Sequence, residues 1–420
     1  MLTQNENDVL TKVGRGTPAG ELLRRYWLVA AAAFELTDEK PIKAVRMLGE
    51  DLVLFRMPLA PGEKHVRYGL VGERCPHRLT SFMNGVVDCE GIRCIYHGWK
   101  FAADGSCLEQ PAEGKDSTFK DRVHHRAYPV QKLGGLLFAY LGPLPAPELP
   151  RWDVLAREDG RRFGMVESLI NCNWLQAMEN SVDPSHLFWL HGTLGSRVLP
   201  PGAERNAIFG LPTEYEEDHE FELVPFGIMK RRFTPHPTPG QPPEMEQHPL
   251  VFPTGLRLVL AMESIFKQGW QASKTITPEE RRVGYVHNLH FRTPVDDEHT
   301  MHYNVSFLPS TQTMLVDDDP PFEVQEFKDA AGNYRMEIVT AQDVLAWEAQ
   351  GSVVDRTQEH LGKGDLGVIM LRKLVRDQID IVAAGGDPLG VIRDAADNVM
   401  IDLDVVHEPF GLYRKEKSIV

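Results

Sequence analysis

The sequence predicts an α+β protein in which a small all-β domain precedes a larger domain built on an antiparallel sheet. Short alternating strands separated by turns are expected over residues 42–57 and again over residues 134–142. Longer strands follow at residues 256–260, 285–291 and 300–307, and amphipathic helices at residues 340–348 and 366–383. Strands and helices that are grouped along a chain are typical of α+β folds.

The composition is that of a globular protein with room for several domains. The chain has 420 residues, of which 42% are hydrophobic and 25% charged. Its net charge of −15 argues against a nucleic-acid partner, which requires a basic surface. Neither a signal peptide nor an apolar run long enough to span a membrane is present, and the five cysteines are few and odd in number. We therefore expect a cytoplasmic protein without a disulfide framework.

The domain boundary is predicted from a cluster of prolines between residues 143 and 150, after the last strand of the first domain. We expect an N-terminal segment, residues 1–40, that packs on the larger domain. The small β domain then spans residues 41–150, and the larger domain spans residues 151–420.

Two mixed pairs of cysteine and histidine lie inside the small β domain. Cys75 and His77 are followed, after sixteen residues, by Cys94 and His97. Such a set could hold zinc. One cysteine and one histidine from each loop instead favour a binuclear iron–sulfur cluster, in which one iron takes both cysteines and the other takes both histidines. The remaining thiols of this region, Cys89 and Cys107, fall outside the pattern and are interpreted as spare.

A second candidate metal site lies in residues 173–192. Asp183, His186 and His191 offer two imidazoles and a carboxylate, the ligand set of an oxygen-activating ferrous centre. The two histidines are five residues apart, about 140° around an ideal α-helix, so the helix must end or distort between them. Gly192 fits a helix end there. In the alternative interpretation, Asp183 caps a helix that begins at Pro184, and the histidines merely pack.

The carboxylate ligand of this second site has several candidates. Asp183 is one, and the aspartate runs at residues 296–297 and 317–319 look like turns. Asp343 lies near the start of a predicted helix. An alternative role for Asp343 is a capping box with Thr340.

A basic strand is the candidate anchor for an anionic substrate. Residues 229–233 alternate apolar and basic side chains, and at most one of Arg231 and Arg232 can point into a pocket from a strand. That side chain could grip a carboxylate bidentately, and the alternative is an outward basic face. Further candidate pocket residues are Ser185, Leu187, Trp189 and Arg197. The proline-rich residues 235–253 are predicted to form a loop over the pocket.

These stretches resemble a known family, the Rieske non-haem iron oxygenases that hydroxylate aromatic rings. Residues 75–78 and 94–101 resemble the Rieske motif, and residues 179–191 resemble the mononuclear iron signature. Residues 22–27, 48–53 and 294–300 resemble the phthalate dioxygenase-like branch, and the resemblance covers most of the chain. It implies a helix-grip fold for the larger domain.

The resemblance also implies the cofactors and their ligands. One [2Fe–2S] cluster would be held by Cys75, His77, Cys94 and His97. One mononuclear Fe(II) would be held by His186, His191 and Asp343. Asp183 would then bridge an iron ligand to a Rieske histidine of the neighbouring subunit, across a head-to-tail homotrimer or a dimer of trimers.

The expected function is that of an oxygenase α subunit. No flavin or nicotinamide site is evident, because the glycine pattern at residues 362–367 lacks a preceding buried strand. The resemblance implies a separate NAD(P)H-dependent reductase with a flavin and a plant-type [2Fe–2S] cluster. We expect cis-dihydroxylation of an aromatic acid of the benzoate, phthalate or aryloxybenzoate type. The alternatives are a monooxygenase or O-demethylase of an aromatic ether, and a Rieske electron carrier fused to a ligand-binding domain.

Overall fold

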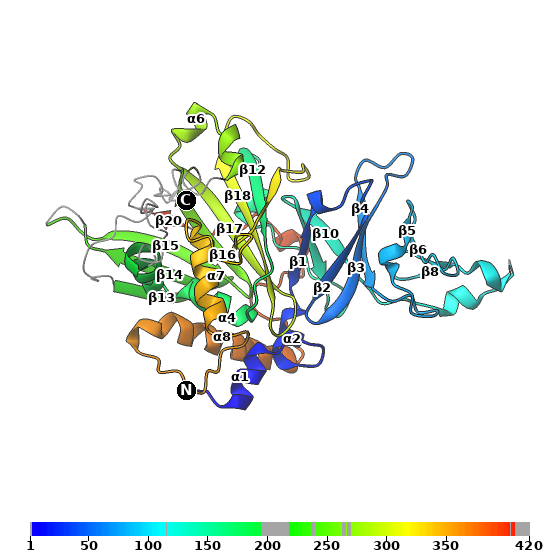
Figure 1. The fold of residues 1–420 in the computed structure, drawn as a ribbon, viewed down its shortest axis with the longest axis horizontal. Helices are drawn as coiled ribbons and strands as arrows, with labels where there is room; N and C mark the ends of the chain where they lie inside the picture. The colour runs from blue at the N-terminus through cyan, green and yellow to red at the C-terminus, as the bar shows by residue number, and fades with distance from the viewer. Residues whose placement is uncertain are drawn as a thin grey trace.

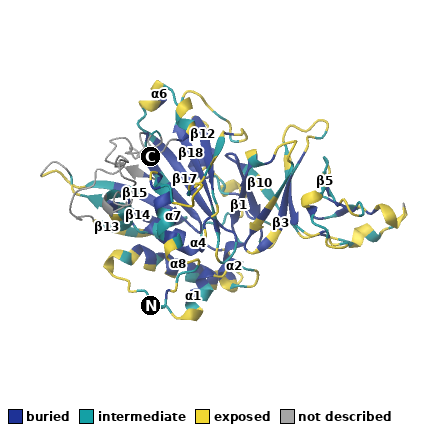
Figure 2. Ribbon diagram, viewed as in Figure 1, coloured by how far each residue is buried: buried dark blue, intermediate teal, exposed yellow. Residues whose placement is uncertain are grey.

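The structure is a computed structural model that describes residues 2–407, apart from residues 115, 195–217, 237–239, 263–265, 267–269 and 404. It contains four sheets and a group of helices (Figure 1). In the described part of the chain, no helix is both long enough and apolar enough to cross a bilayer. Buried residues are concentrated along the strands of the largest sheet, and exposed residues along the loops (Figure 2).

The first β domain consists of three small antiparallel sheets. The hairpin predicted over residues 42–57 is confirmed as β2 and β3. The strands of the first sheet, in order, are β2 (Ile42–Met47), β3 (Glu50–Met57), β4 (Arg67–Gly72) and β9 (Ala127–Tyr128). Those of the second are β5 (Val86–Val87), β6 (Ile92–Arg93), β7 (Lys100–Phe101) and β8 (Cys107–Glu109). Those of the third are β1 (Trp27–Ala32), β11 (Leu136–Tyr140) and β10 (Val130–Leu133).

The larger domain is built on a nine-stranded sheet that is antiparallel except where β12 and β19 pair. Along the sheet the strands are β13 (Asp218–Val224), β14 (Gly227–Thr234), β15 (Glu244–Val251), β16 (Gly255–Ala261), β17 (Tyr285–Pro294), β18 (Thr300–Pro309), β12 (Gly160–Glu167) and β19 (Phe322–Gln325), and β20 (Val406–His407) pairs with β15. The predicted strands at residues 256–260, 285–291 and 300–307 are confirmed. The prediction that residues 235–253 form one loop is wrong, because β15 lies within them and pairs with β14.

Two helices pack on one face of this sheet. They are α4 (Trp174–Val182) and α7 (Val339–Ala349), and Arg292 of β17 contacts both. The long helix α8 (Leu366–Ala383) lies beside α4 and beside the N-terminal helices α1 (Gln4–Thr11) and α2 (Pro18–Leu23) (Figure 1). The short helices α3 (Asp153–Ala156) and α6 (Pro278–Arg281) complete the set of described α-helices.

The predicted α+β fold, with a small all-β domain and a helix-grip domain, is confirmed. The predicted domain limits stay a prediction, and β1, from the predicted N-terminal segment, pairs with β11.

The sheet face beneath α4 and α7 is polar, although it is buried. Because strand residues alternate between the two faces, Asn288, His290 and Arg292 of β17 share this face with His302, Asn304 and Ser306 of β18. All six are buried. Buried polar side chains cost free energy unless they are partnered, so a polar inner face is a candidate for function.

Candidate metal centres

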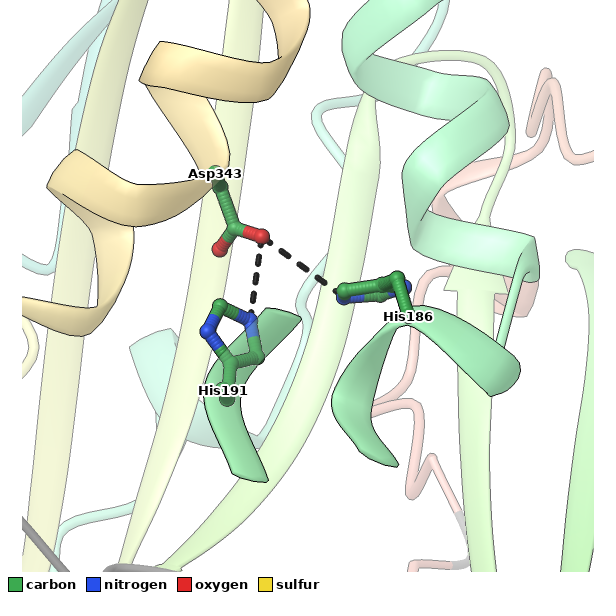
Figure 3. A group of neighbouring side chains, drawn as sticks. All are labelled: His186, His191 and Asp343. Atoms are coloured by element: carbon green, nitrogen blue, oxygen red, sulfur yellow. Dashed lines mark ion pairs between the residues drawn. The ribbon is translucent and has the colours of Figure 1, made fainter. Parts of the chain in front are cut away.

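Three side chains from two distant segments converge under the polar sheet face. The ligand atoms of His186, His191 and Asp343 all lie within 4.8 Å of one another. Nε2 of His191 is 3.1 Å from Oδ1 of Asp343, and Nε2 of His186 is 3.6 Å from the same oxygen (Figure 3). Among the described residues, no other three histidine, cysteine or acidic side chains form such a group.

The backbone explains how two histidines five residues apart reach one point. After α4 ends, residues Leu187–Leu194 form a π-helix, whose i→i+5 hydrogen bonds bring residues five apart close to one face. The predicted distortion is therefore confirmed. The prediction that the helix ends at Gly192 is wrong, because the π-helix continues through it. Asp183 is the C-cap residue of α4, and its Oδ1 also accepts a hydrogen bond from the backbone N–H of Ser185 at 2.8 Å, so its interpretation as the cap of the following helical segment is confirmed.

Asp343 points at the histidines from α7. The helix begins after Ile338, which makes no side-chain cap. Asp343 therefore lies beyond the first turn, and the capping-box interpretation with Thr340 is wrong. Burial raises the pKa of Asp343, but His191 and His186 outweigh it and lower the pKa to about 2. The same pairing raises the pKa of His191 against the effect of its burial.

Further polar side chains hold these three in place. Nδ1 of His191 faces Oε1 of Gln342 at 3.0 Å, and the amide of Asn180 donates to Oδ1 of Asp343 at 3.3 Å. Oδ2 of Asp183 lies 3.7 Å from Nδ1 of His186. Metal-bound histidines commonly use their second nitrogen in this way. Two imidazoles and an ionised carboxylate that share one point fit a ferrous ion with open positions.

The four cysteine and histidine side chains of the first domain also come together. Cys75 and His77 lie in the loop after β4, and Cys94 and His97 lie between β6 and β7. The two imidazole rings are 4.5 Å apart between centroids, and the two thiols are neighbours. Burial and the nearby Cys94 raise the pKa of Cys75 to about 11 in the metal-free chain.

The arrangement of these donors distinguishes the two metals considered for them. Ligands of one tetrahedral zinc ion would lie within about 4 Å of one another, given metal–ligand distances of about 2.0–2.3 Å. No three of these four residues have ligand atoms that all lie within 4.8 Å of one another. A buried thiol pair with a separate imidazole pair fits a binuclear cluster. Cys107 instead contacts the carbonyl of Glu109, and both Cys107 and Cys89 are free thiols.

A cavity opens beside the histidine–aspartate centre. Its apolar wall and its polar wall lie on different elements, as the lining residues show. The apolar lining comes mainly from β16 and includes Leu256, Leu258, Val259, Leu260 and Trp270. The polar lining comprises Asn180, Ser181, Lys230, Glu246, His248, His290, Arg292, Asn304 and Thr340, together with the three converging side chains. An apolar cavity with a few convergent polar groups is the usual form of a small-molecule site.

The basic residues predicted for this cavity are not the ones that line it. Arg231 points away and bonds to Glu222 and Gln247, and Arg232 pairs with Glu246 behind the lining. The hydroxyl of Ser185 donates to Asp183. Of the other candidates, Leu187 lines the cavity, Trp189 is exposed and does not, and Arg197 lies outside the described residues.

Two cations that were not predicted take their place. The Lys230 ammonium donates to the carbonyl of Ser181 at 3.0 Å, and the Arg292 guanidinium donates to the Ser181 hydroxyl. Both cations are buried, and neither has a carboxylate within ion-pair distance among the described residues. Burial lowers the pKa of Lys230 to about 8 and that of Arg292 to about 10.

Fold and sites together define a protein class: a β domain suited to a [2Fe–2S] cluster joined to a helix-grip domain with a two-histidine, one-carboxylate centre. Comparison with known families agrees. A family described as "Rieske [2Fe-2S] domain" matches residues 26–133, and one described as "LigXa C-terminal domain like" matches residues 323–406. The first match contains the four cysteine and histidine residues, and the second contains Asp343.

Relatives extend over nearly the whole chain. The 5,5'-dehydrodivanillate O-demethylase oxygenase subunit of Sphingobium sp. is 36% identical over 97% of this chain and 87% of its own length. The phenoxybenzoate dioxygenase subunit alpha of Ectopseudomonas oleovorans is 31% identical over 92% of this chain and 88% of its own. A structure of NdmA of Pseudomonas putida CBB5 with caffeine shares the fold, with a TM-score of 0.61 at 18% identity over 88% of this chain and 94% of that one.

This chain belongs to the Rieske non-haem iron oxygenases, as an oxygenase α subunit. It is therefore an oxidoreductase, and its cofactors are a Rieske [2Fe–2S] cluster and a mononuclear iron. Subunits of this kind belong to multicomponent systems and need a reductase.

Proposed function

We propose that this chain is the terminal oxygenase for an aromatic acid that carries a methyl ether, and that it removes the methyl group. The observation that supports an acid is the Lys230 ammonium in the wall of the cavity, which has no carboxylate within ion-pair distance in the described part of the chain. The relative with 36% identity is named as an O-demethylase, which supports the reaction.

The cationic wall is built for an anion. Lys230 has three N–H donors, and only the bond to Ser181 uses one of them among the described residues. A buried ammonium with no carboxylate within ion-pair distance among the described residues is costly, and a substrate carboxylate would supply a close counter-ion. The guanidinium of Arg292 binds the same serine, so the two cations form one anion-binding subsite. The apolar side chains of β16 then offer a surface for an aromatic ring.

The metal sites divide the chemistry between them. We propose His186, His191 and Asp343 as the ligands of the mononuclear iron, which supplies oxygen activation at its open positions when bound. We propose Cys75, His77, Cys94 and His97 as the ligands of the cluster. Gln342 and Asn180 then orient iron ligands, and the apolar wall keeps water from the reacting ring.

Electrons are proposed to arrive from a neighbouring subunit. The small sheet of β5 to β8, next to the cluster loops, lies at one end of the molecule, away from α4 and α7 (Figure 1). Leu79, Ile95 and Tyr96, beside the cluster loops, are exposed apolar side chains suited to an interface. We propose a head-to-tail homotrimer in which Asp183, beside His186, connects the two centres. A cytoplasmic NAD(P)H-dependent reductase with a flavin and a plant-type cluster would supply the electrons.

The proposed reaction balances with two electrons and two protons. The methyl aryl ether and O2 yield the phenol, formaldehyde and water. The C–H bond of the methyl group becomes C–OH, and the resulting hemiacetal loses formaldehyde. One oxygen atom leaves in formaldehyde and the other in water.

A second candidate is dihydroxylation of the ring. Its support is the similarity to a phenoxybenzoate dioxygenase subunit at 31% identity. The proposed anion-binding subsite and the two metal centres serve this reaction equally well. The product, and not the site, separates the two candidates.

The test is a single turnover of the reduced, iron-loaded protein with ¹⁸O2. The panel holds methoxybenzoates and phenoxybenzoates, each with its neutral amide as a matched control. We expect phenol and labelled formaldehyde from a methoxylated acid and much less product from its amide. Gain of two oxygen atoms and two hydrogens would replace demethylation by dihydroxylation.

Failure of every panel compound, with the cluster reoxidised and iron bound, would contradict the proposal and favour the electron-carrier hypothesis. His186→Ala provides the matched variant. In an oxygenase this change abolishes product and leaves the visible spectrum of the cluster unchanged. A carrier would retain its electron-transfer rate.

A further inference from the structure

Three buried titratable side chains on the polar sheet face form a continuous row that ends at the cavity. Glu167, His302 and His290 lie on the adjacent strands β12, β18 and β17. They are 1%, 0% and 7% exposed. Oε2 of Glu167 is in contact with Nδ1 of His302, and Nε2 of His302 is 3.0 Å from Nδ1 of His290.

Strand register places all three on the face that carries the cavity. Val166 pairs with Tyr303, so the next residue, Glu167, lies level with His302. His302 pairs with Arg292, and His290 lies two residues further along β17 on the same face. Since His290 and Arg292 both line the cavity, the row runs across the sheet from Glu167 towards the iron site.

Both ends of the row have unused polar atoms. Nε2 of His290 is buried, lines the cavity side of the row, and has no hydrogen-bond partner among the described residues. Both carboxyl oxygens of Glu167 and Nδ1 of His302 are also buried without a hydrogen-bond partner among the described residues, although Oε2 and Nδ1 are in contact. Glu167 is the last residue of β12, and Leu169, two residues later, is 47% exposed. The row therefore runs from the end of β12, two residues before the exposed Leu169, to the cavity.

The charges around the row favour its neutral form. Burial raises the pKa of Glu167 to about 8, and burial lowers the pKa of both histidines well below their ordinary range. The charged groups that face the row are Arg292 on β17 and Asp343 on α7. A protonated carboxyl beside two neutral imidazoles is a set of donors and acceptors arranged in series.

We propose that Glu167, His302 and His290 form a proton relay that delivers protons from the end of β12 to the cavity during oxygen reduction. His290 gives its Nε2 proton to the oxygen being reduced, or to a water beside it. His290 then accepts a proton at Nδ1 from Nε2 of His302, and His302 accepts one at Nδ1 from the Glu167 carboxyl. Glu167 is left as a carboxylate and is reprotonated from solvent.

Turnover needs such a path because the reaction consumes protons. Two electrons, two protons and O2 are required for demethylation and for dihydroxylation alike, so this inference depends on the oxygenase class and not on the proposed substrate. The wall formed by β16 is apolar and offers no proton donor. Of the three residues of this row, His290 is the one that lines the cavity in the described part of the chain. His290 is then a catalytic residue, and Glu167 and His302 act through it.

The experiment compares Glu167→Gln with the parent in single turnovers in H2O and D2O. Glutamine keeps the size and hydrogen bonding of the side chain but cannot release a proton. Ser306→Ala is the matched control, since Ser306 lies on the same buried face and its hydroxyl accepts a hydrogen bond from Asn288, outside the row. His290→Gln is the second variant. The substrate is whichever panel compound the parent converts, and iron content, cluster spectrum and substrate Kd are measured on each variant.

We expect Glu167→Gln and His290→Gln to form product roughly 100-fold more slowly, in line with the loss of a general acid. Both should release more hydrogen peroxide per O2 consumed, with iron content and cluster spectrum unchanged. Glu167→Gln should also leave substrate Kd unchanged. The parent and Ser306→Ala should react more slowly in D2O than in H2O.

Parent-like rates and product yields in a folded, metal-loaded Glu167→Gln would overturn the relay. So would the absence of a solvent isotope effect on product formation in the parent, a measurement that needs no variant. Failure of the proposed substrate class is a separate result, because it appears as a lack of product from acids in the parent itself.

Discussion

Nδ1 of His191 lies 3.0 Å from Oε1 of Gln342, the residue directly before Asp343 in α7. One turn of one helix thus supplies a carboxylate to Nε2 of the histidine and an amide oxygen to Nδ1. The amide nitrogen of Gln342 donates to the carbonyl of Met336 at 2.7 Å, which fixes the orientation of the amide. This assigns the proton of the neutral imidazole to Nδ1 and directs the lone pair of Nε2 towards Asp343, where a metal would bind.

The first prediction concerns this orientation. Gln342→Leu should weaken iron binding by about 10- to 100-fold, the usual effect of removing the hydrogen-bond partner of a ligating histidine. Titration of the apo protein with ferrous iron measures it. Gln350→Ala, at the exposed C-cap of the same helix, is the control and should bind iron as the parent does. Unchanged affinity in Gln342→Leu would show that packing alone orients His191.

The second prediction concerns the anion-binding subsite. Lys230→Met should raise the Kd of the aromatic acid by about 10- to 100-fold, because a charge-assisted hydrogen bond contributes about 1.5–3 kcal/mol. The neutral amide analogue should lose little affinity. Arg231→Met is the matched control, since Arg231 lies on the same strand and bonds away from the cavity to Glu222. Equal losses for acid and amide would refute a charge-specific role of Lys230.

The third prediction is the pH dependence of acid binding. Burial lowers the pKa of Lys230 to about 8, while Asp183 and Glu246 raise it and Arg232 and Arg292 lower it. A carboxylate binds the protonated ammonium, so affinity should be constant below pH 8 and fall by about tenfold per pH unit above it. Calorimetry between pH 6.5 and 9.5 measures this. A profile for Lys230→Met that falls at the same pH would assign the titration to another group.

The fourth prediction concerns the buried anchor of α4. Glu179 accepts hydrogen bonds from Arg356 at 2.7 and 2.9 Å and from Arg372 at 2.6 Å. Glu179→Ala leaves the Arg356 guanidinium buried without its anion, whereas Arg372 keeps its pair with Glu359, so we expect a loss of about 3–5 kcal/mol in the free energy of unfolding. Urea denaturation measures it. Asp377→Asn, in an exposed pair on α8, should change the free energy by less than about 0.5 kcal/mol.

The same network has a definite acid response. Burial raises the pKa of Glu179, but the two arginines outweigh it and hold the pKa below the ordinary value of 4.5. The stability contributed by the ionised carboxylate is thus present above the ordinary carboxyl pKa. It is lost as the pH falls through the lowered value. Glu179→Ala should therefore flatten the acid limb of the stability profile.

The fifth prediction separates cluster ligands from spare thiols. Cys75→Ser should lose the cluster, with its visible absorbance and its two irons and two labile sulfides per chain. Cys107→Ser should retain all of them, because its thiol contacts the carbonyl of Glu109 instead. Metal and sulfide analysis of both variants provides the measurement. Zinc in place of iron in the parent would contradict the binuclear assignment.

Much of the site could be predicted because its information is local. Cysteine and histidine at fixed short spacings imply a metal whatever the fold, and the mixed order indicated the cluster. His186 and His191 were found in the same way. Asp343 depended on resemblance to the family, because a lone aspartate near a helix start is equally typical of a cap.

The parts that could not be predicted depend on long-range packing. Both faces of β14 mix apolar and basic side chains, so its sequence does not show which face meets the cavity, and Lys230 was overlooked in favour of its arginine neighbours. Arg292 lies in β17, for which the sequence pattern predicts a strand but no functional residue. β15 was predicted as loop because of its prolines, and it forms because β14 offers a complete antiparallel partner. Tertiary pairing outweighed local propensity in that case.

Lys230 and Arg292 are both tied to Ser181, in the last turn of α4, and that turn leads directly into Asp183 and His186. A ligand that draws either cation into the cavity must therefore pull on the end of this helix. The residues that bind the acid and the residues that bind the iron are thus connected through Ser181. Binding of an acid in the cavity is therefore expected to shift the segment that holds the metal ligands.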